Sequence, residues 1–167
     1  MTRSSGRPWG AQWPEDLSAV AAELDTHFRS NPYLKHLGGE IESWGLGWAR
    51  TMLTPTGDVA NIVGTAHGGV VAGLADCAFE VACNSYGRAC VAAELSVHFL
   101  APSRIGKTLV AEAREIGRST RLASYEVNVK EDVGGSRPVA TLLALAYRTE
   151  RWHLGTERYP DDWRTRY

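Results

Sequence analysis

The segment 66–87 constrains the fold of this chain more than any other, because it joins a glycine-rich start to an almost wholly apolar helix. After His67-Gly68-Gly69, apolar residues recur at the i, i+3, i+4 and i+7 spacing of a helix with a buried face. These positions are Val70, Val71, Leu74, Ala75, Ala78, Phe79 and Ala82. Small or apolar residues fill most of the remaining positions, so we expect the helix to be buried on most sides. Asp76 lies within it, where an unpaired charge is costly.

Composition narrows the class of protein. The chain has 167 residues, which fits one domain, and a net charge of -1 with no dominant basic patch, so nucleic acid is not an expected partner. The start lacks the apolar core of a signal peptide, and no apolar run reaches the ~18 residues of a membrane span, so we expect a cytoplasmic protein without a membrane partner. Cys77, Cys83 and Cys90 form no CxxC pair and suit a reducing compartment. The histidines show no HxH or HExxH spacing, so no metal site is expected.

The first third of the chain contains an irregular arm, a helix and a strand region. Residues 1–14 are expected to form the arm, and helical spacing of apolar residues predicts a helix over 15–28 that Asn31-Pro32 stops. β-Branched and aromatic residues over 39–53 indicate one long strand or a hairpin. Thr, Pro, Gly and Asp over 54–65 indicate a loop. The apolar helix then runs from about 69 to 86 and ends at Gly87.

Beyond that helix the apolar period changes to two, which is typical of strands. Strands are expected over 91–99, 109–117, 121–130 and 139–148, with turns at Pro102–Gly106 and Gly134-Gly135. The last strand is the most continuously apolar and is expected to be central, and the short connections predict an antiparallel meander. Residues 149–167 mix charged residues with Trp and Tyr and form an appendage.

One helix that is apolar on most sides can be wrapped by one curved antiparallel sheet. The fold prediction is therefore α+β, a hot-dog fold whose sheet surrounds the helix at 69–86, with an added N-terminal helix and a C-terminal arm. We divide the chain into an arm and helix at 1–34, a hot-dog domain at 35–148 and a C-terminal extension at 149–167.

A series of spaced residues resembles the PaaI-type hot-dog thioesterases, a family named for phenylacetate degradation. The series reads Asn61-x5-His67-Gly-Gly-x4-Leu74-Ala-Asp76-x-Ala-Phe79-x3-Cys83-Asn-Ser85-x-Gly87, and Phe99-Leu100-x-Pro102-x3-Gly106, Tyr125-x-Val127-x-Val129 and Tyr147-Arg148 follow it. The resemblance covers roughly 35–148. It implies hydrolysis of an acyl-CoA thioester, such as phenylacetyl-CoA or hydroxyphenylacetyl-CoA, at a dimer interface, usually within a tetramer of two dimers. CoA is then part of the substrate, and no cofactor is expected.

Departures from the family pattern concern the substrate more than the reaction. Cys77 stands where a Thr is usual, Glu80 where a small residue is common, Lys107 where an acidic residue is common, and Ala101 where an Arg is frequent. These positions are expected to lie close to the acyl pocket or the CoA track.

Thioester hydrolysis needs a group that stabilises the carbonyl oxygen and a supplied nucleophile. Amides at a helix start are unpaired and favour an anion, and the resemblance assigns this role to Gly68. Asp76 is expected to act as general base or nucleophile, the alternative being a structural carboxylate. His67 either bonds the thioester region or holds the loop. Asn61 either lies near the catalytic water or forms a turn.

Further residues are candidates for substrate binding. Gly69, Phe79, Glu80, Asn84 and Ser85 are expected along the acyl site, although Asn84 and Ser85 can instead cap the helix. Glu80 is one turn beyond Asp76, and it either tunes the pocket or pairs with an Arg of a partner chain. The cations expected near the CoA phosphates are Arg104, Lys107, Arg118 and Arg121.

Asp76 is about two turns beyond Gly68, too far along one helix for both to meet one carbonyl. A second copy, antiparallel across a dimer, brings them together, so we expect at least a homodimer and, from the resemblance, a homotetramer. Two alternatives remain. One is a hot-dog hydratase or dehydratase, whose His-Phe motif His98-Phe99 matches only at its start. The other is a non-catalytic acyl-CoA-binding protein.

Overall fold

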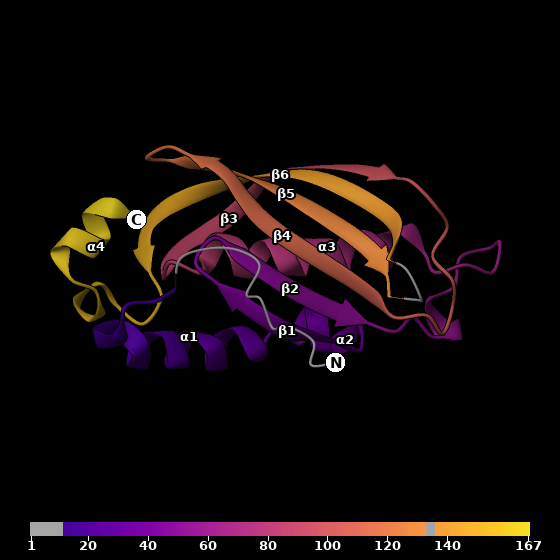
Figure 1. The fold of residues 1–167 in the computed structure, drawn as a ribbon, viewed down its shortest axis with the longest axis horizontal. Coiled ribbons are helices and arrows are strands. Elements are labelled where there is room, and N and C mark those ends of the chain that lie inside the picture. The colour runs from indigo at the N-terminus through magenta and orange to yellow at the C-terminus, as the bar shows by residue number, and fades with distance from the viewer. Residues whose placement is uncertain (1–11, 133–135) are drawn as a thin grey trace, which may run out of the picture.

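The structure is a computed structural model that describes residues 12–132 and 136–167. Within them, six antiparallel strands form one sheet that curves around a long helix, α3, which spans Gly68–Asn84 (Figure 1). The predicted hot-dog fold is confirmed, with the helix bounds shifted by one or two residues. The predicted arm falls mostly on 1–11, and the turn at Gly134-Gly135 falls on 133–135; both lie outside the described residues.

The sheet order is β1-β2-β4-β5-β6-β3. The strand bounds are β1 Gly39–Gly45, β2 Trp48–Leu53, β3 Arg88–Phe99, β4 Leu109–Arg118, β5 Leu122–Glu131 and β6 Arg137–Trp152. Of the two readings of 39–53, the hairpin is confirmed. β6 is an interior strand, paired with β5 on one side and β3 on the other.

The prediction of one continuous meander is wrong for β3, which pairs with β6 rather than with β4. Pro102 ends the strand region, and the connection then crosses the ends of the neighbouring strands instead of folding back as a hairpin. The amides of Leu100 and Ala101 donate to the carbonyl of Val139 at 2.8 and 3.2 Å, and Gly106 donates to Pro55 at 2.8 Å. β3 therefore forms one edge of the sheet in the protomer, and β1 forms the other.

Glu131 stabilises this crossing connection through ion pairs. Its fully buried carboxylate accepts hydrogen bonds from Arg104 (Nη2 at 2.6 Å) and Arg137 (Nη2 at 2.6 Å). Burial alone raises the pKa of Glu131, but the bonds from Arg137 and Arg104 outweigh it and lower the pKa to about 2. Next to Arg104, the backbone carbonyl of Ser103 accepts the amide of Ala66 at 2.9 Å, so the crossing connection also fixes the approach to α3.

Replacing Glu131 with Gln is expected to lower the free energy of unfolding by about 3 kcal/mol at pH 7, because two arginines lose their buried partner. The stabilisation exists above the ordinary carboxyl pKa of 4.5 and is lost as the pH falls from there to about 2. Urea unfolding at pH 7 and pH 3 measures both effects, and the difference between wild type and variant should shrink at pH 3. Glu112→Gln removes two more exposed ion pairs, with Arg50 and Lys130, and should cost under about 1 kcal/mol. Equal losses in the two variants would contradict the assignment.

The N-terminal helices pack below the sheet and α3 (Figure 1). A short turn at Glu15–Leu17 leads into α1, Ser18–Arg29, and α2 follows at Pro32–His36. Asn31 both ends the first helical region and caps α2, because its Oδ1 accepts the amides of Tyr33 and Leu34 at 3.0 Å. Within the described residues, no helix is long and apolar enough to cross a membrane.

The C-terminal extension covers the end of α3. After β6, the chain forms a turn at Thr156–Arg158 and the helix α4 at Asp161–Arg166. Trp163 donates its Nε1–H to the carbonyl of Tyr86 at 3.0 Å, and the rings of Tyr167 and Tyr86 stack at 4.6 Å. Gly87 has φ +87°, and a Cβ there would lie 2.3 Å from the ring of Tyr159, so glycine is required for this closure.

Candidate active site

One stripe of α3 is left open by the sheet. It contains Gly69, Ala72, Asp76 and Glu80, which recur every three or four residues and are partly or fully exposed. The rest of the helix from Val70 onward is buried, which confirms the predicted burial on most sides. Asp76 therefore lies on the face of the helix that a substrate or a second subunit can reach.

Asp76 and Glu80 line a cavity of about 560 Å³ between α3, the junction of α1 and α2, and the start of β3. Phe79, Phe28 and Tyr33 contribute aromatic surface to its wall. Its further lining residues include His27, Asn31, Cys83, Asn84, Cys90 and His153. The cavity thus combines an apolar wall with a polar end, which is the usual composition of a small-molecule site.

Both carboxyl groups in the cavity are easier to protonate than ordinary ones. Burial raises the pKa of Asp76. Burial also raises the pKa of Glu80, the hydrogen bond from Asn31 lowers it, and the charge of Asp76 raises it again, with a net upward shift. Two carboxylates one turn apart in a partly dry site disfavour each other's ionisation. Perturbed acids of this kind are candidates for proton transfer.

Glu80 has a partner within its own chain. Its Oε2 accepts the side-chain N–H of Asn31 at 2.5 Å, so α3 is tied to the cap of α2. A pairing of Glu80 with an Arg of another subunit remains a prediction. The side chain of Phe79 also contacts the sheet. Its ring packs edge-on against that of Tyr125, with 5.3 Å between the ring centroids.

The start of α3 presents one free amide. His67 is the N-cap, and its Nδ1 accepts the N–H of Gly69 at 2.9 Å, which supports its loop-holding role. The amide of Gly69 is therefore occupied. Among residues 12–132 and 136–167, the amide of Gly68 has no hydrogen-bond partner. The ring of Phe99 lies beside it, since a Cβ on Gly68 would be 3.1 Å from Phe99 Cζ.

Asn61 organises the loop before α3. Its Oδ1 accepts the amides of Val63 and Thr65 at 3.1 Å, and its Nδ2 donates to Thr65 Oγ1 at 2.8 Å. It does not line the cavity. The turn-forming alternative for Asn61 is therefore the one that these contacts support.

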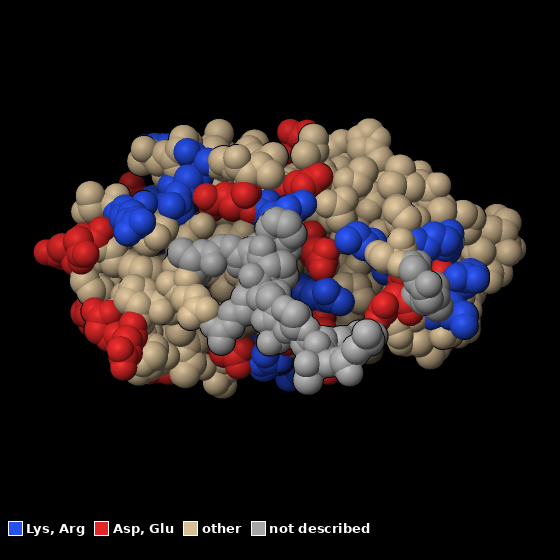
Figure 2. Space-filling view, in the orientation of Figure 1, with Lys and Arg blue, Asp and Glu red and all other residues tan. Residues whose placement is uncertain are grey.

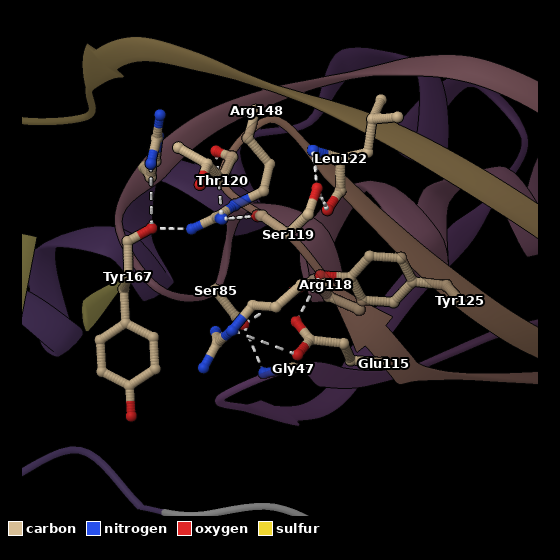
Figure 3. Close-up of polar contacts among 12 residues, drawn as sticks. Gly47, Ser85, Glu115, Arg118, Ser119, Thr120, Leu122, Tyr125, Arg148 and Tyr167 are labelled. Atoms are coloured by element: carbon tan, nitrogen blue, oxygen red, sulfur yellow. Dashed lines mark hydrogen bonds and ion pairs between the residues drawn. The ribbon is translucent and has the colours of Figure 1, made fainter. Parts of the chain in front are cut away.

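Asn84 and Ser85 differ in their positions. Asn84 lines the cavity, whereas Ser85 is fully buried outside it, donating to Ala82 at 2.7 Å and accepting the amide of Gly47 at 2.7 Å. Placing Ser85 along the acyl site is not supported, because its hydroxyl closes the end of α3 instead (Figure 3).

The four predicted phosphate-binding cations form two groups rather than one. Arg104 and Lys107 precede β4, whereas Arg118 is its last residue and Arg121 follows it, about 33 Å along the strand. Arg104 forms an ion pair with Glu131. Figure 2 shows positive and negative side chains interspersed on the face in view, without one large basic area.

Arg118 also contacts side chains of its own protomer. Its guanidinium lies 4.5 Å from the ring centres of both Tyr86 and Tyr167, and its Nε is 3.6 Å from Glu115 (Figure 3). Of the four cations, Lys107 and Arg121 have no side-chain partner among the described residues.

Sequence reasoning missed several cavity residues, notably His27, Asn31 and His153. Asn31 had a usable signal, because an Asn before Pro is typical of a helix cap. His98, which the hydratase alternative uses, pairs in register with Thr141. Thr141 lies between buried Ala140 and Leu142, so this row faces away from α3 and the cavity.

The chain is similar to known thioesterases. Residues 63–136 match the family model of the thioesterase superfamily. The acyl-coenzyme A thioesterase PaaI of Escherichia coli is 34% identical over 102 residues, which cover 61% of this chain and 73% of that protein. A putative esterase of Archaeoglobus fulgidus is 30% identical over 125 residues, covering 75% of this chain and 77% of the relative.

A solved structure gives the same result. The E. coli PaaI protein from the phenylacetic acid degradation operon superposes with a TM-score of 0.75 at 30% identity, covering 82% of this chain and 99% of that one. Both the sequence and the fold therefore point to the same family.

Proposed function

Since this chain belongs to the thioesterase superfamily, as a PaaI-type hot-dog thioester hydrolase, we propose that it hydrolyses an acyl-CoA with a compact or aromatic acyl group, such as phenylacetyl-CoA. The observation that carries this proposal is that Asp76 opens into a cavity of about 560 Å³ walled by Phe79, Phe28 and Tyr33. A space of this size suits a compact group better than a long chain.

In this proposal the reaction needs two groups from α3. Asp76 takes a proton from water, or attacks the thioester carbon itself, and the N–H of Gly68 stabilises the oxygen on which charge develops. Support for Gly68 comes from the occupied amide of Gly69, which leaves the Gly68 amide as the free donor at this helix start.

The active unit is proposed to be a dimer at minimum. Gly68 and Asp76 are eight residues apart, or about 12 Å along the helix axis, so one helix cannot offer both to one carbonyl. The open stripe of α3 lies next to the edge strand β3, where Leu95 and Phe99 are 38% and 57% exposed. A second copy packed antiparallel there covers these apolar side chains and brings its Gly68 to Asp76.

We extend the assembly to a tetramer of two dimers. The outer face of the sheet carries Leu122, Leu143 and Tyr147, all at least 40% exposed, and Leu122 and Tyr147 are directly paired in register. A second apolar surface on the opposite side of the sheet from α3 is what a dimer of dimers requires. Lys107 and Arg121 are retained as candidate phosphate contacts.

An assay of free-thiol release over a panel of CoA thioesters tests this function. We expect kcat/KM for phenylacetyl-CoA and hydroxyphenylacetyl-CoA to exceed that for palmitoyl-CoA by about tenfold or more, since a cavity of about 560 Å³ suits a compact acyl group better than a long chain. Acetyl-CoA serves as the control for binding of the CoA portion alone. Equal kcat/KM for all four substrates, or release with palmitoyl-CoA only, would contradict the proposed acyl group.

A further inference from the structure

Two cysteines from different elements lie in the wall of the same cavity. Cys83 lies in the last turn of α3 and Cys90 in the first residues of β3, and both line the cavity that holds Asp76. Their side chains lie close enough for each thiol to shift the pKa of the other. Cys83 is 3% exposed and Cys90 is partly exposed, so a small reagent in the cavity reaches Cys90 first.

Asn84 holds the two cysteines in place. Its Nδ2 lies 3.3 Å from both Cys83 Sγ and the Cys90 carbonyl, and its Oδ1 accepts the Cys90 amide at 2.8 Å. The same Oδ1 accepts Nε2–H of His153 at 2.8 Å, because Nδ2 is the donor of the amide. Asn84 therefore fixes Cys83 and Cys90 relative to each other and links them to His153 at the polar end of the cavity.

The two thiols are electrostatically unequal. Cys90 pairs in register with Arg148 in β6. The hydrogen bond from Cys83 lowers the pKa of Cys90, burial opposes this, and the charges of Arg148 and Arg88 lower the pKa further, with a net downward shift. The pKa of Cys83 is raised by its bond to Cys90 and by burial. Cys90 is therefore the more reactive nucleophile of the pair.

We propose that Cys83 and Cys90 form a dithiol modification site inside the cavity, which hydrogen peroxide converts to a disulfide. The Cys90 thiolate attacks one peroxide oxygen, so an S–O bond forms, the O–O bond breaks, and the departing hydroxide takes a proton to give water. The sulfur of Cys83 then attacks the Cys90 sulfur, forming the S–S bond and breaking the S–O bond. The second hydroxide takes the Cys83 proton, so the pair loses two electrons and peroxide becomes two waters.

Closing this bond alters the wall of the cavity. Cys83 Sγ loses its contacts with the Glu80 carbonyl at 3.4 Å and with Asn84 at 3.3 Å. Asn84 in turn positions His153, so the polar end rearranges. Resting on the proposed function, we expect oxidation to lower kcat/KM for phenylacetyl-CoA by about tenfold, as a wall displaced by about 1 Å disturbs the fit of the acyl group.

Intact-mass analysis and thiol titration test the modification without any substrate. The full-length protein is reduced, freed of reductant, and treated with hydrogen peroxide. The titratable thiols under denaturing conditions should fall from three to one. The mass should fall by about 2 Da, and dithiothreitol should reverse both changes. Peptide mapping should show Cys83 joined to Cys90.

Variants in which one cysteine is replaced test the role of each thiol. Cys83→Ser should leave a dimedone-reactive sulfenic acid on Cys90, which adds about 16 Da, because the resolving thiol is absent. Cys90→Ser should abolish the response. Cys77→Ala is the matched control, since Cys77 is buried on α3 with its pKa raised to about 12 by burial, and its variant should still lose about 2 Da. Three titratable thiols after treatment, or an unchanged mass loss in Cys90→Ser, would overturn the proposal.

The outcomes separate this proposal from the proposed function. If the protein forms the disulfide but releases no thiol from any CoA ester, the dithiol proposal is supported and the proposed function is contradicted. If the protein hydrolyses CoA esters while its three thiols stay titratable in peroxide, the proposed function is supported and the dithiol proposal is contradicted.

Discussion

Replacing Asp76 with Asn should lower kcat for thiol release by about 10³-fold or more, with CoA binding and assembly retained. The amide has nearly the same size as the carboxylate but can neither accept a proton from water nor attack the thioester carbon. Asp76 lies on the open stripe of α3 and is half-buried in the cavity wall, so the substitution leaves the packed faces of the helix untouched. Single-turnover release of CoA, together with calorimetric binding of free CoA, measures the two effects separately.

The pH dependence follows from the burial of this carboxyl. Because burial raises the pKa of Asp76, the acid limb of kcat should lie above the ordinary Asp value of 3.8, and activity should fall as the pH drops through the raised value. Glu80→Gln is the matched control on the same stripe. It should keep activity within about tenfold of wild type and move the acid limb to lower pH, because one repelling charge is removed.

Two results would contradict the role of Asp76. The first is near-normal turnover in Asp76→Asn, and the second is a loss in Glu80→Gln as large as that in Asp76→Asn, which would make Glu80 the base. Single turnover in heavy-oxygen water then distinguishes nucleophilic attack by Asp76 from general-base catalysis. Label in the Asp76 carboxylate indicates attack by the side chain, because a general-base route places the labelled oxygen only in the released acid.

Local patterns predicted most of the fold because they report which face of an element is buried. The apolar spacing located α3 to within two residues, and the period-two segments located the strands. The same patterns carry no information about which strands are neighbours. The position of β3 beside β6 depends on the crossing connection and on buried Glu131, and an isolated Glu at the end of a strand looks like an ordinary surface residue.

The site was predictable in part for the same reason. Asp76 and the glycines stand out because a charge and a bare backbone are unusual in a buried helix. The cavity residues His27 and His153 come from elements at opposite ends of the chain, and each resembles an ordinary surface histidine until the fold brings the two rings within 5.1 Å. The contacts of Arg118 were not predictable, because the sequence does not show which tyrosine rings the fold brings beside it.

The second large effect concerns the amide of Gly68. Gly68→Pro should lower kcat by about 10²–10³-fold, because proline removes one oxyanion donor while remaining acceptable at the first position of a helix. The preceding His67 has φ -62° and ψ 139°, a conformation that a following proline favours. Gly68→Ala keeps the N–H and adds a Cβ 3.1 Å from the movable ring of Phe99, so it is the matched control and should lose about tenfold or less.

Complementation between these two inactive chains tests whether the site is shared. Co-expression of Asp76→Asn and Gly68→Pro with different tags allows the heterodimer to be purified. If Asp76 of one subunit works with Gly68 of the other, one of the two sites contains both native groups, and the heterodimer should show about half of wild-type activity. If each chain supplied both groups to its own site, neither site would be intact and no activity would return. Because about 12 Å of helix separates the two groups within a chain, recovery is the expected result.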